Sequence, residues 1–526
     1  MDSIAVGKLL AMDLAQGWED EALGTVAFDR LPADVRAMLF PSIFANDRIL
    51  VGHDLPAASG VASADALEET SRGSNDWVIA GAHTASGLPL LANDPHLGLG
   101  VPSIWSAVHL SSPELEAAGV VLPGTPGVTL GRNRHIAWGC TNVHDDSADL
   151  YVEEFDPHDP DRYRVPEGWE RVQTRHEAIR VRQGPLSSSV RTVDHAVRVT
   201  RHGPLVTIGA RQYALRWTSL ADDAVELTGF MRLLRAGNWD EFRDALRQFP
   251  GPAQNFVYAD TDGHIGWYSA GRLPIRRGGD GSRPYAGSSP DGDWLGFVPF
   301  DDLPHVADPP SGRIVTANNR LVGTDYPYKV TRGGIGPWRA AALFERLESH
   351  EGWTADDIAR LQGERLSIPH RDLARLLLET ASRHPGDGAW DDVVREMKGW
   401  DGRLEPDSRP AALAVLTFRA IGMRVILPKV EGSPFARGLA KRVAAIHKLI
   451  LERPASWVPA GDRDWDGVLL AAWRSAEAEI TKGLGPDRAR WRWDALNVMA
   501  VQHPLARAFT LLAPLLSPPA VPMGGS

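Results

Sequence analysis

The hydrophobic pattern changes character at three points along the chain, and these changes limit the folds that are possible. Residues 1–45 show the three-to-four spacing of a helix, whereas residues 46–73 are mostly polar and small, as in an exposed linker. Residues 74–338 hold short apolar runs separated by Gly, Pro and Asn, a pattern that predicts strands and hairpins. Residues 339–526 return to helical spacing. A long β-rich part followed by a mostly helical part predicts an α+β fold.

The charge balance and the apolar runs exclude several classes of partner. The 526 residues carry 56 basic and 67 acidic side chains, a net charge of −11, and show no basic stripe. We therefore expect neither nucleic acid nor an anionic membrane surface as a partner. The longest apolar runs, Leu413–Leu427 and Ala508–Leu516, are short and interrupted, so no membrane span is expected. The single cysteine, Cys140, excludes an intrachain disulfide and a CxxC motif.

Several common catalytic signatures are absent from the sequence. It contains no Walker A motif, no GxSxG elbow, no HExxH motif and no EF-hand loop. The glycines of the HLGLG stretch do not form a GxGxxG motif on a strand–helix turn. Phosphate and dinucleotide chemistry therefore has little support.

The junction Gly73–Ser74 is the first candidate for chemistry, because the polar linker ends there and the first strand begins. A serine hydroxyl is a weak nucleophile that needs a base. Cleavage before Ser74 would free an α-amine with a pKa of ~7.7–8.0, compared with ~10.4 for lysine, so this amine could accept a proton near neutral pH. One residue would then supply both nucleophile and base. The alternative is that Ser74 is an ordinary turn residue.

Several sequence blocks occur in one order from residue 73 onward. They are GSNDWVIAG, LLANDPHLG, PGVTLGRNRHIAWGCTN, HDDSADLY, TRHGPL, NFVYADTDGHIGW and SGRIVTANN. In order and spacing these blocks resemble the penicillin acylase family of N-terminal-nucleophile hydrolases, in which Gly-Ser-Asn-x-Trp is the self-cleavage and nucleophile motif. The resemblance extends over essentially the whole chain.

The resemblance implies catalytic roles at the matching positions. Ser74 would be the nucleophile, and its α-amine, freed by cleavage of the Gly73–Ser74 bond, would be the base. Asn318 would direct its side-chain amide at the oxyanion of the tetrahedral intermediate. A second donor would be the backbone N–H of Asn142, or that of Val143 if the strand register differs by one residue.

Two further residues, His96 and Arg339, match family positions near the nucleophile. His96 would orient the hydroxyl or tune the amine, although an isolated histidine is more often structural. Arg339 would hold the side chain of Asn318 or bind a substrate carboxylate. The alternative for Arg339 is a surface salt bridge.

Four positions match the family's acyl pocket, namely Leu97, Leu130, Cys140 and Phe230. This wall is more aliphatic than the aromatic wall of family members that accept phenylacetyl groups. The resemblance therefore implies a fatty or other apolar acyl chain, because small pockets discriminate mainly by shape. The alternative for each of the four residues is a place in the hydrophobic core.

A structural calcium ion is a further implication of the resemblance, at Asp146, Asp149 and the carbonyl of Ala148. Hard oxygen ligands suit calcium. Two other ligand positions of the family do not carry acidic residues in this chain, which has Val330 at one and Val6 at the other. The two missing ligands weigh against calcium; a bound calcium ion would be structural, and no cofactor is expected to be required for the chemistry.

The resemblance implies a four-layer αββα sandwich with a mostly helical C-terminal half. Residues 1–45 would be the end of a small subunit, and residues 46–73 a spacer. The large subunit would comprise a β-rich core over residues 74–338 and a helical part over residues 339–526. Both subunits would come from one precursor and stay together. Family members extend further at both ends, so the chain is expected to be incomplete, and the family suggests a periplasmic or secreted location.

The expected reaction is hydrolysis of a small-molecule N-acyl amide through an acyl-enzyme on Ser74. Penicillins, cephalosporins and N-acyl-homoserine lactones are the substrates that the resemblance implies, and these point to antibiotic metabolism or quorum quenching. Three alternatives stay open: a cyclic-lipopeptide deacylase with the same chemistry, an inactive truncated scaffold, and a serine hydrolase with a His/Asp relay.

Overall fold

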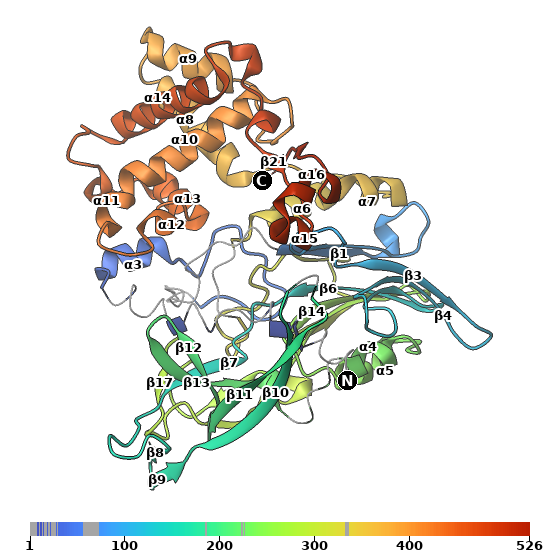
Figure 1. The fold of residues 1–526 in the computed structure, drawn as a ribbon. Helices are drawn as coiled ribbons and strands as arrows, with labels where there is room; N and C mark the ends of the chain where they lie inside the picture. Colours follow the sequence, from blue (N-terminus) through green and yellow to red (C-terminus); the bar gives the residue numbers. More distant parts are fainter. Residues whose placement is uncertain are drawn as a thin grey trace.

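Two β-sheets packed face to face lie at the centre of the computed structural model (Figure 1). The structure describes residues 8–9, 11–12, 14, 18, 21–22, 28, 30–55, 73–184, 187–221, 223, 225, 227–331 and 336–525. Most of the predicted spacer therefore lies outside the described residues, as does much of the predicted N-terminal helical segment.

The two central sheets are antiparallel. The first has three strands in the order β2 (Leu90–His96), β1 (Gly73–Ile79) and β20 (Arg313–Thr316). The second has seven strands in the order β19 (His305–Ala307), β15 (Ile265–Ala270), β14 (Gln254–Asp260), β6 (Ile136–Asn142), β5 (Leu130–Arg132), β4 (Glu116–Val121) and β3 (Ser106–Ser111). Strands β1 and β2 pack against β6 and β14, which makes the interior between the sheets.

The side chains of β1 show why this strand is buried on both faces. Trp77 and Ile79 belong to one core cluster and Val78 belongs to another. Successive side chains of a strand point to opposite faces. Trp77 and Ile79 therefore meet the helices above the first sheet, whereas Val78 meets the second sheet.

Helices cover the outer faces of both sheets. Above the first sheet lie α6 (Trp338–Glu348) and α7 (Ala355–Leu361), whose apolar side chains join the cluster around Trp77 (Figure 1). Against the second sheet lie α4 (Leu227–Leu233) and α5 (Trp239–Leu246), where the ring of Phe242 packs on that of Tyr258. The order helix, sheet, sheet, helix confirms the predicted four-layer α+β fold.

A separate six-stranded sheet extends from the sandwich, and the sequence pattern did not distinguish it from the core sheets. Its order is β10 (Gln173–Arg182), β11 (Val190–Thr200), β12 (Gly203–Ile208), β13 (Arg211–Trp217), β7 (Ala148–Val152) and β17 (Tyr285–Ala286). Two short hairpins lie beside it, β8 (Arg162–Val165) with β9 (Gly168–Arg171), and β16 (Pro274–Arg276) with β18 (Trp294–Phe297). Strand β7 directly follows the loop after β6, so this sheet begins next to the sandwich.

The C-terminal half is helical, as predicted. Its helices are α8 (Ile368–Ala381), α9 (Gly388–Met397), α10 (Arg409–Val425), α11 (Leu427–Val430), α12 (Ala436–Leu439), α13 (Val443–Glu452), α14 (Trp465–Leu484), α15 (Pro504–Ala508) and α16 (Ala513–Leu516). Strands β21 (Val498–Met499) and β22 (Val521–Pro522) form a small pair near the end. Helix α10 lies at the centre of this half, packed on α14, and its residues from Ala411 to Phe418 are all buried.

The N-terminal helix α3 (Ala33–Leu39) packs into this helical half, far away in sequence. Val35, Leu39 and Phe40 are buried in the same cluster as α10 and α14. The Arg442 side chain donates a hydrogen bond to the carbonyl of Leu39 at 3.1 Å. The segment before the predicted cleavage point is thus anchored to the segment after it.

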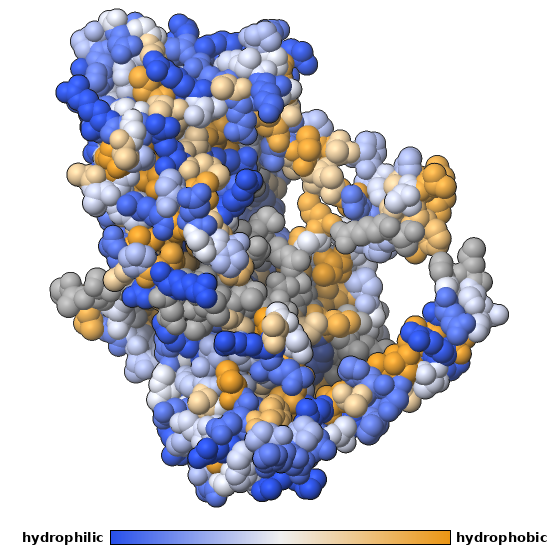
Figure 2. Space-filling view, turned by 60° about the vertical axis from the view of Figure 1, so that its left-hand side comes forward, coloured by the Kyte–Doolittle hydropathy of each residue, from blue (hydrophilic) through white to orange (hydrophobic). Residues whose placement is uncertain are grey.

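Most of the surface visible in Figure 2 is hydrophilic, with hydrophobic residues in scattered groups. None of the helices within the described residues has the length and apolar character that crossing a membrane requires.

The buried side chain of Asn133 joins the turn between β5 and β6 to the chain after α4. Its oxygen accepts hydrogen bonds from the backbone N–H groups of His135 and Ile136, both at 2.8 Å. Its amide nitrogen donates to three carbonyls, those of Leu233 at 3.1 Å, Leu234 at 3.3 Å and Ala236 at 2.7 Å. One side chain therefore makes hydrogen bonds to five backbone groups of two segments, which buried backbone groups require.

We predict that Asn133→Ala lowers the free energy of unfolding by about 2–4 kcal/mol, because it leaves several buried polar groups without a partner. Urea denaturation measures this loss. Asn238→Ala is the matched control, since Asn238 caps α5 through one hydrogen bond, from the N–H of Glu241 at 3.0 Å. The control should lose only about 1 kcal/mol. Equal losses for the two variants would contradict the assignment.

Candidate active site

Ser74 lies at the beginning of β1, where the first sheet meets the end of β6. It is the second residue of the strand, and only 6% of its surface is exposed. The antiparallel register places Gly73 opposite His96 and Ser74 opposite Pro95, at the end of β2. The quoted blocks GSNDWVIAG and LLANDPHLG thus pair as neighbouring antiparallel strands, which brings Ser74 and His96 to the same end of the sheet.

The side chain of Asn318 connects Ser74 to the second sheet. Its oxygen Oδ1 accepts a hydrogen bond from the backbone N–H of Ser74 at 2.7 Å. Its nitrogen Nδ2 donates to the carbonyl of Asn142, the last residue of β6, at 2.9 Å. Asn318 has a φ of +63°, in the left-handed region that asparagine tolerates better than most residues. This turn after β20 directs the amide into the site.

Arg339, at the start of α6, binds the same group of atoms. Its Nη1 donates to the carbonyl of Ser74 and to Oδ1 of Asn75, both at 2.7 Å, and its Nη2 donates to Oδ1 of Asn318 at 3.0 Å. These three acceptors are uncharged. Burial lowers the pKa of the Arg339 guanidinium to about 10. Arg339 is therefore a partly buried cation that faces the nucleophile, and the alternative of a surface salt bridge does not describe it.

Glycine at position 73 is required by the close approach of Arg339. A Cβ atom on Gly73 would lie 2.7 Å from Nη2 of Arg339 and 3.3 Å from Oδ1 of Asn318. The hydroxyl of Ser74 donates a hydrogen bond to the carbonyl of Gly73 at 2.7 Å. The hydroxyl thus lies beside the carbonyl group of the predicted cleavage bond.

The strand register distinguishes Asn142 from Val143 as a candidate backbone donor. Val143 donates its N–H to the carbonyl of Ala253 at 3.1 Å, on the side of β14. Successive residues of an antiparallel strand direct their N–H groups to opposite edges. The N–H of Asn142 therefore points to the other edge of β6, the edge at which its carbonyl meets Asn318. The geometry favours Asn142.

His96 lies at the rim of this group and is exposed to solvent. Partial desolvation, followed by the positive charge of Arg339, lowers its pKa below the ordinary value. Among the described residues, no hydrogen bond joins His96 to Ser74, and no acidic side chain forms an ion pair with it. A His/Asp relay that includes His96 therefore has no support in the geometry.

The four predicted pocket residues are only partly brought together. Cys140 on β6 is paired with Phe256 on β14, and the ring of Phe230 lies 6.1 Å from that of Phe256. Cys140 and Phe230 pack against the same core cluster. Leu130 is buried on the neighbouring strand β5, whereas Leu97 lies half-buried in the loop after β2. Burial, and then the nearby charge of Asp76, raise the pKa of the Cys140 thiol, so it remains neutral.

Two residues that the sequence analysis did not single out, Asn93 and Asp76, lie next to the site between the two central sheets. Asn93 on β2 donates to the carbonyls of Asn75 at 2.9 Å and Cys140 at 3.0 Å, and so ties the two sheets together. Asp76 is fully buried between the sheets. Desolvation, and then the charge of Asp94, raise its pKa well above the usual range. Both residues lie inside the quoted blocks, but the sequence contained no signal for which face of the strand they occupy.

The candidate calcium ligands lie where β7 begins, and positively charged side chains already contact them. Arg276 donates from Nε to Oδ2 of Asp149 at 2.8 Å and from Nη2 to the carbonyl of Asp146 at 2.6 Å. The Nζ of Lys329 lies 3.1 Å from Oδ2 of Asp146. Val330 is buried in an apolar cluster and Val6 lies outside the described residues.

These surroundings do not fit a calcium ion. Within the described part of the chain, no group of three or more His, Cys, Asp or Glu side chains is arranged to hold a metal. The calcium site stays a prediction from the resemblance. The oxygen atoms that would bind the metal are in contact with two cationic side chains instead.

Comparison with known proteins agrees with this architecture. The family model for penicillin amidase matches residues 1–526. A penicillin acylase 2 proenzyme from Pseudomonas sp. (strain SE83) is 30% identical over 508 residues, 95% of this chain and 62% of that protein. The acyl-homoserine lactone acylase QuiP of Pseudomonas aeruginosa is 28% identical over 554 residues, 94% of this chain and 64% of that protein. The chain thus spans less than two thirds of the length of these relatives.

A solved structure shows the same fold. A thermostable penicillin G acylase from Alcaligenes faecalis superposes with a TM-score of 0.67 at 23% identity, over 79% of this chain and 80% of that chain. Fold, sequence blocks and the match over the full length lead to one conclusion, that this chain belongs to the penicillin amidase family.

Proposed function

We propose that this chain belongs to an amide hydrolase that cleaves its own Gly73–Ser74 bond and then uses Ser74 as an N-terminal nucleophile. The observation that carries this proposal is the set of contacts around Ser74. Its amide N–H, its carbonyl and its hydroxyl contact, respectively, Oδ1 of Asn318, Nη1 of Arg339 and the carbonyl of Gly73. The future amine and the hydroxyl are thus held in place before cleavage.

Self-cleavage would proceed by attack of the Ser74 oxygen on the carbonyl carbon of Gly73. The C–N bond breaks as the new ester bond forms, and the proton of the hydroxyl passes to the leaving nitrogen. Water then hydrolyses the ester, which leaves a carboxylate on Gly73 and a free amine on Ser74. The hydrogen bond of 2.7 Å between the hydroxyl and this carbonyl supports the path, because it keeps the two groups in contact.

The freed amine of Ser74 would be the general base for substrate turnover. Oδ1 of Asn318 would continue to accept one of its hydrogens, which orients the lone pair of the nitrogen. The partly buried guanidinium of Arg339, which donates to uncharged acceptors, disfavours a second positive charge nearby. This repulsion would lower the pKa of the amine, so the amine is neutral and able to take the hydroxyl proton at neutral pH.

Asn318 and Asn142 would stabilise the oxyanion of the tetrahedral intermediate. The Asn318 amide has two N–H groups, and the carbonyl of Asn142 accepts one of them. The other would donate to the substrate oxygen, together with the backbone N–H of Asn142. Both donors are fixed by the fold before the substrate arrives, which is the arrangement that lowers the barrier most effectively.

The N-terminal piece would stay bound after cleavage and form a heterodimer with the large piece. Besides the apolar contacts of α3, the side chain of Arg320 binds Asp47 and Asp54 of that piece, each at 2.6 Å. Arg320 follows Asn318 by two residues, so the same contacts support the turn that carries the amide. No covalent bond would be needed to keep the site assembled.

The substrate would be an N-acyl amide with an apolar acyl chain. The names of the relatives indicate penicillins and acyl-homoserine lactones, both of which contain such a bond. Cys140 and Phe230, which pack against the same core cluster, would form an apolar wall next to β6, and Leu130, buried on β5, would extend it. Removal of a β-lactam side chain and of a homoserine lactone acyl chain would use the same chemistry on Ser74.

The first prediction concerns maturation. The expressed chain should separate into two pieces on a denaturing gel, and N-terminal sequencing of the large piece should begin at Ser74. Ser74→Ala removes the attacking oxygen and should leave one uncut chain, whereas the control Ser86→Ala, at an exposed serine, should be cut normally. Cutting of the Ser74→Ala chain at the same bond would exclude the mechanism.

Acetylation of the new α-amine of Ser74 should abolish activity. A serine hydrolase with a His/Asp relay would keep its activity after the same treatment.

The second prediction concerns the oxyanion. In the matured protein, Asn318→Ala should reduce kcat by about 10²–10³-fold with little change in KM, because the lost donor acts mainly in the transition state. Asn318→Asp keeps an acceptor for the amine but replaces the donor by a negative charge, so its loss should be at least as large. A kcat within a few-fold of that of the unmodified protein would remove Asn318 from the mechanism.

The third prediction concerns the acyl chain. For linear acyl amides, kcat/KM should rise about fourfold per added methylene until the pocket is filled, since one buried CH2 contributes ~0.8 kcal/mol. The measurement is a series of acyl lengths with one leaving amine, compared with phenylacetyl. Linear chains should be preferred. A strong preference for phenylacetyl would contradict the assignment of Leu97, Leu130, Cys140 and Phe230 to the pocket.

A further inference from the structure

Two buried carboxylates and two cationic side chains form a compact cluster beside the sandwich. The side chains of Asp146 and Asp149 are 2% and 0% exposed, and that of Arg276 is 5% exposed. Lys329 completes the group with Nζ at 3.1 Å from Oδ2 of Asp146. A calcium ion carries two positive charges, and here two side chains supply the same number.

The individual contacts use the oxygen atoms that a metal would need. Arg276 donates to Oδ2 of Asp149 and to the carbonyl of Asp146, while its Nη2 lies 3.5 Å from Oδ2 of Asp146. The indole N–H of Trp294 also donates to Oδ2 of Asp149 at 2.5 Å. Calcium requires roughly six to eight oxygen ligands, and donors of hydrogen bonds on these atoms oppose its binding.

The backbone closes over the guanidinium. A Cβ atom on Gly281 would lie 2.4 Å from Oδ2 of Asp146 and 2.7 Å from Cζ of Arg276. Gly281 has a φ of +78°, in the region that favours glycine. The loop after β16 is therefore shaped around the ion pair, so Arg276 belongs to the packed interior.

The cluster connects the two chain segments that bear the candidate oxyanion donors. Asp146 follows Asn142 in the loop after β6, and Lys329 lies on the segment that continues from Asn318. The hydroxyl of Thr331 on this second segment donates to the carbonyl of His144 on the first at 3.2 Å. A tie between these two segments is the structural task that a bound ion would perform.

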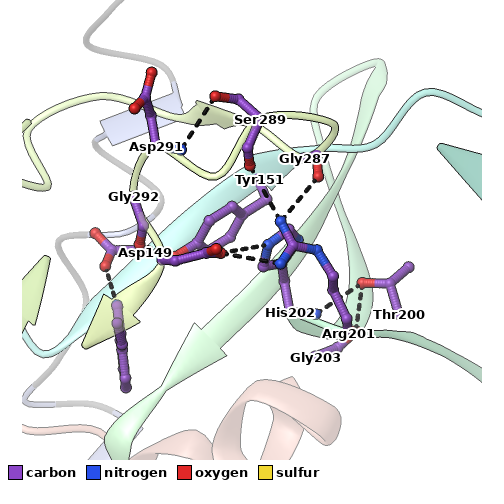
Figure 3. Close-up of polar contacts among 12 residues, drawn as sticks. Asp149, Tyr151, Thr200, Arg201, His202, Gly203, Gly287, Ser289, Asp291 and Gly292 are labelled. Carbon is purple, nitrogen blue, oxygen red and sulfur yellow. Dashed lines mark hydrogen bonds and ion pairs between the residues drawn. The ribbon is translucent and has the colours of Figure 1, made fainter. Parts of the chain in front are cut away.

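Polar side chains continue along the same face of β7 and beyond its end. Tyr151 and Glu153 follow Asp149 in positions that alternate with Leu150 and Val152. The ring of Tyr151 stacks on that of His202 at 3.7 Å, and its hydroxyl donates to the carbonyl of Gly292 at 2.6 Å (Figure 3). Glu153 lies 2.9 Å from Nδ1 of His202, which belongs to the TRHGPL block. Side chains of this chain therefore hold the whole strand in place.

We propose that the guanidinium of Arg276 and the ammonium of Lys329 replace the structural calcium ion in this protein. They neutralise Asp146 and Asp149 and tie the loop after β6 to the segment after Asn318. The proposal is independent of the catalytic role of Ser74, and it makes the chain stable without a metal.

The fourth prediction tests the unmodified protein. After dialysis against a chelator, elemental analysis should find no calcium, and the Tm should be the same in excess chelator and in millimolar calcium. Calorimetry gives the Tm without reference to activity, so a failure of the proposed chemistry does not affect the result. Stoichiometric calcium that survives dialysis, or a Tm that the chelator lowers and calcium restores, would overturn the proposal.

The Tm values of variants of the two cationic side chains provide a second, independent test. Arg276→Gln and Lys329→Gln should each lower the Tm by several degrees, since one buried carboxylate loses its partner. The double variant Arg276→Gln/Lys329→Gln should gain a rise in Tm on addition of calcium. Arg424→Gln is the matched control, because it breaks a comparable pair with Asp462, at 2.6 Å, in the helical half.

The control should lose stability without any response to calcium. Unchanged Tm values for both single variants, or a folded double variant that calcium does not stabilise, would overturn the proposal. If the double variant does not fold, the single variants and the unmodified protein decide the question.

Discussion

The side-chain amide of Asn318 is the contact on which the rest of the site depends. It accepts a hydrogen bond from the N–H of Ser74, donates one to the carbonyl of Asn142, and is held by the guanidinium of Arg339. These groups come from β1, β6 and α6, which are far apart in the sequence and meet only in the folded sandwich. A buried amide is costly unless both of its ends are satisfied, so this residue links the packing of three layers to the position of one nucleophile.

Charged side chains are arranged in opposite ways at two sites near the ends of β6 and β20. One is the cluster around Asp146 and Asp149, and the other is the candidate active site around Ser74. Around Asp146 and Asp149, two cations contact two buried anions, and one of the cations, Lys329, also lies 3.6 Å from the exposed carboxylate of Asp280. Around Ser74, the acceptors that contact Arg339 within the described part of the chain are uncharged oxygen atoms, and desolvation lowers the pKa of Arg339 to about 10. Paired charges avoid the cost of a buried charge without a partner, whereas a partly buried cation among uncharged acceptors favours the negative charge that a reaction develops. The first arrangement suits a structural site and the second a reactive one.

Much of the fold followed from pattern and resemblance together. The α+β division could be predicted because short apolar runs with turn residues differ from helical spacing. The family could be predicted because several sequence blocks kept their order. The separate six-stranded sheet was not distinguished from the sandwich, since half-exposed strands with charged residues look alike in either sheet. The choice between Asn142 and Val143 also needed the structure, because a shift of one residue reverses the direction of the N–H and leaves the sequence unchanged.

The sequence by itself determined the identity of the candidate groups: a glycine before a serine at the start of a strand, an asparagine after a later strand, and an arginine before the helical half. Only the tertiary structure decided what surrounds them. Asn93, Asp76, Arg276 and Lys329 are ordinary polar residues in the sequence, and each takes its place from which face is buried and which loop closes over it. Burial and approach distance are properties of the packed chain, because they depend on residues that are hundreds of positions apart.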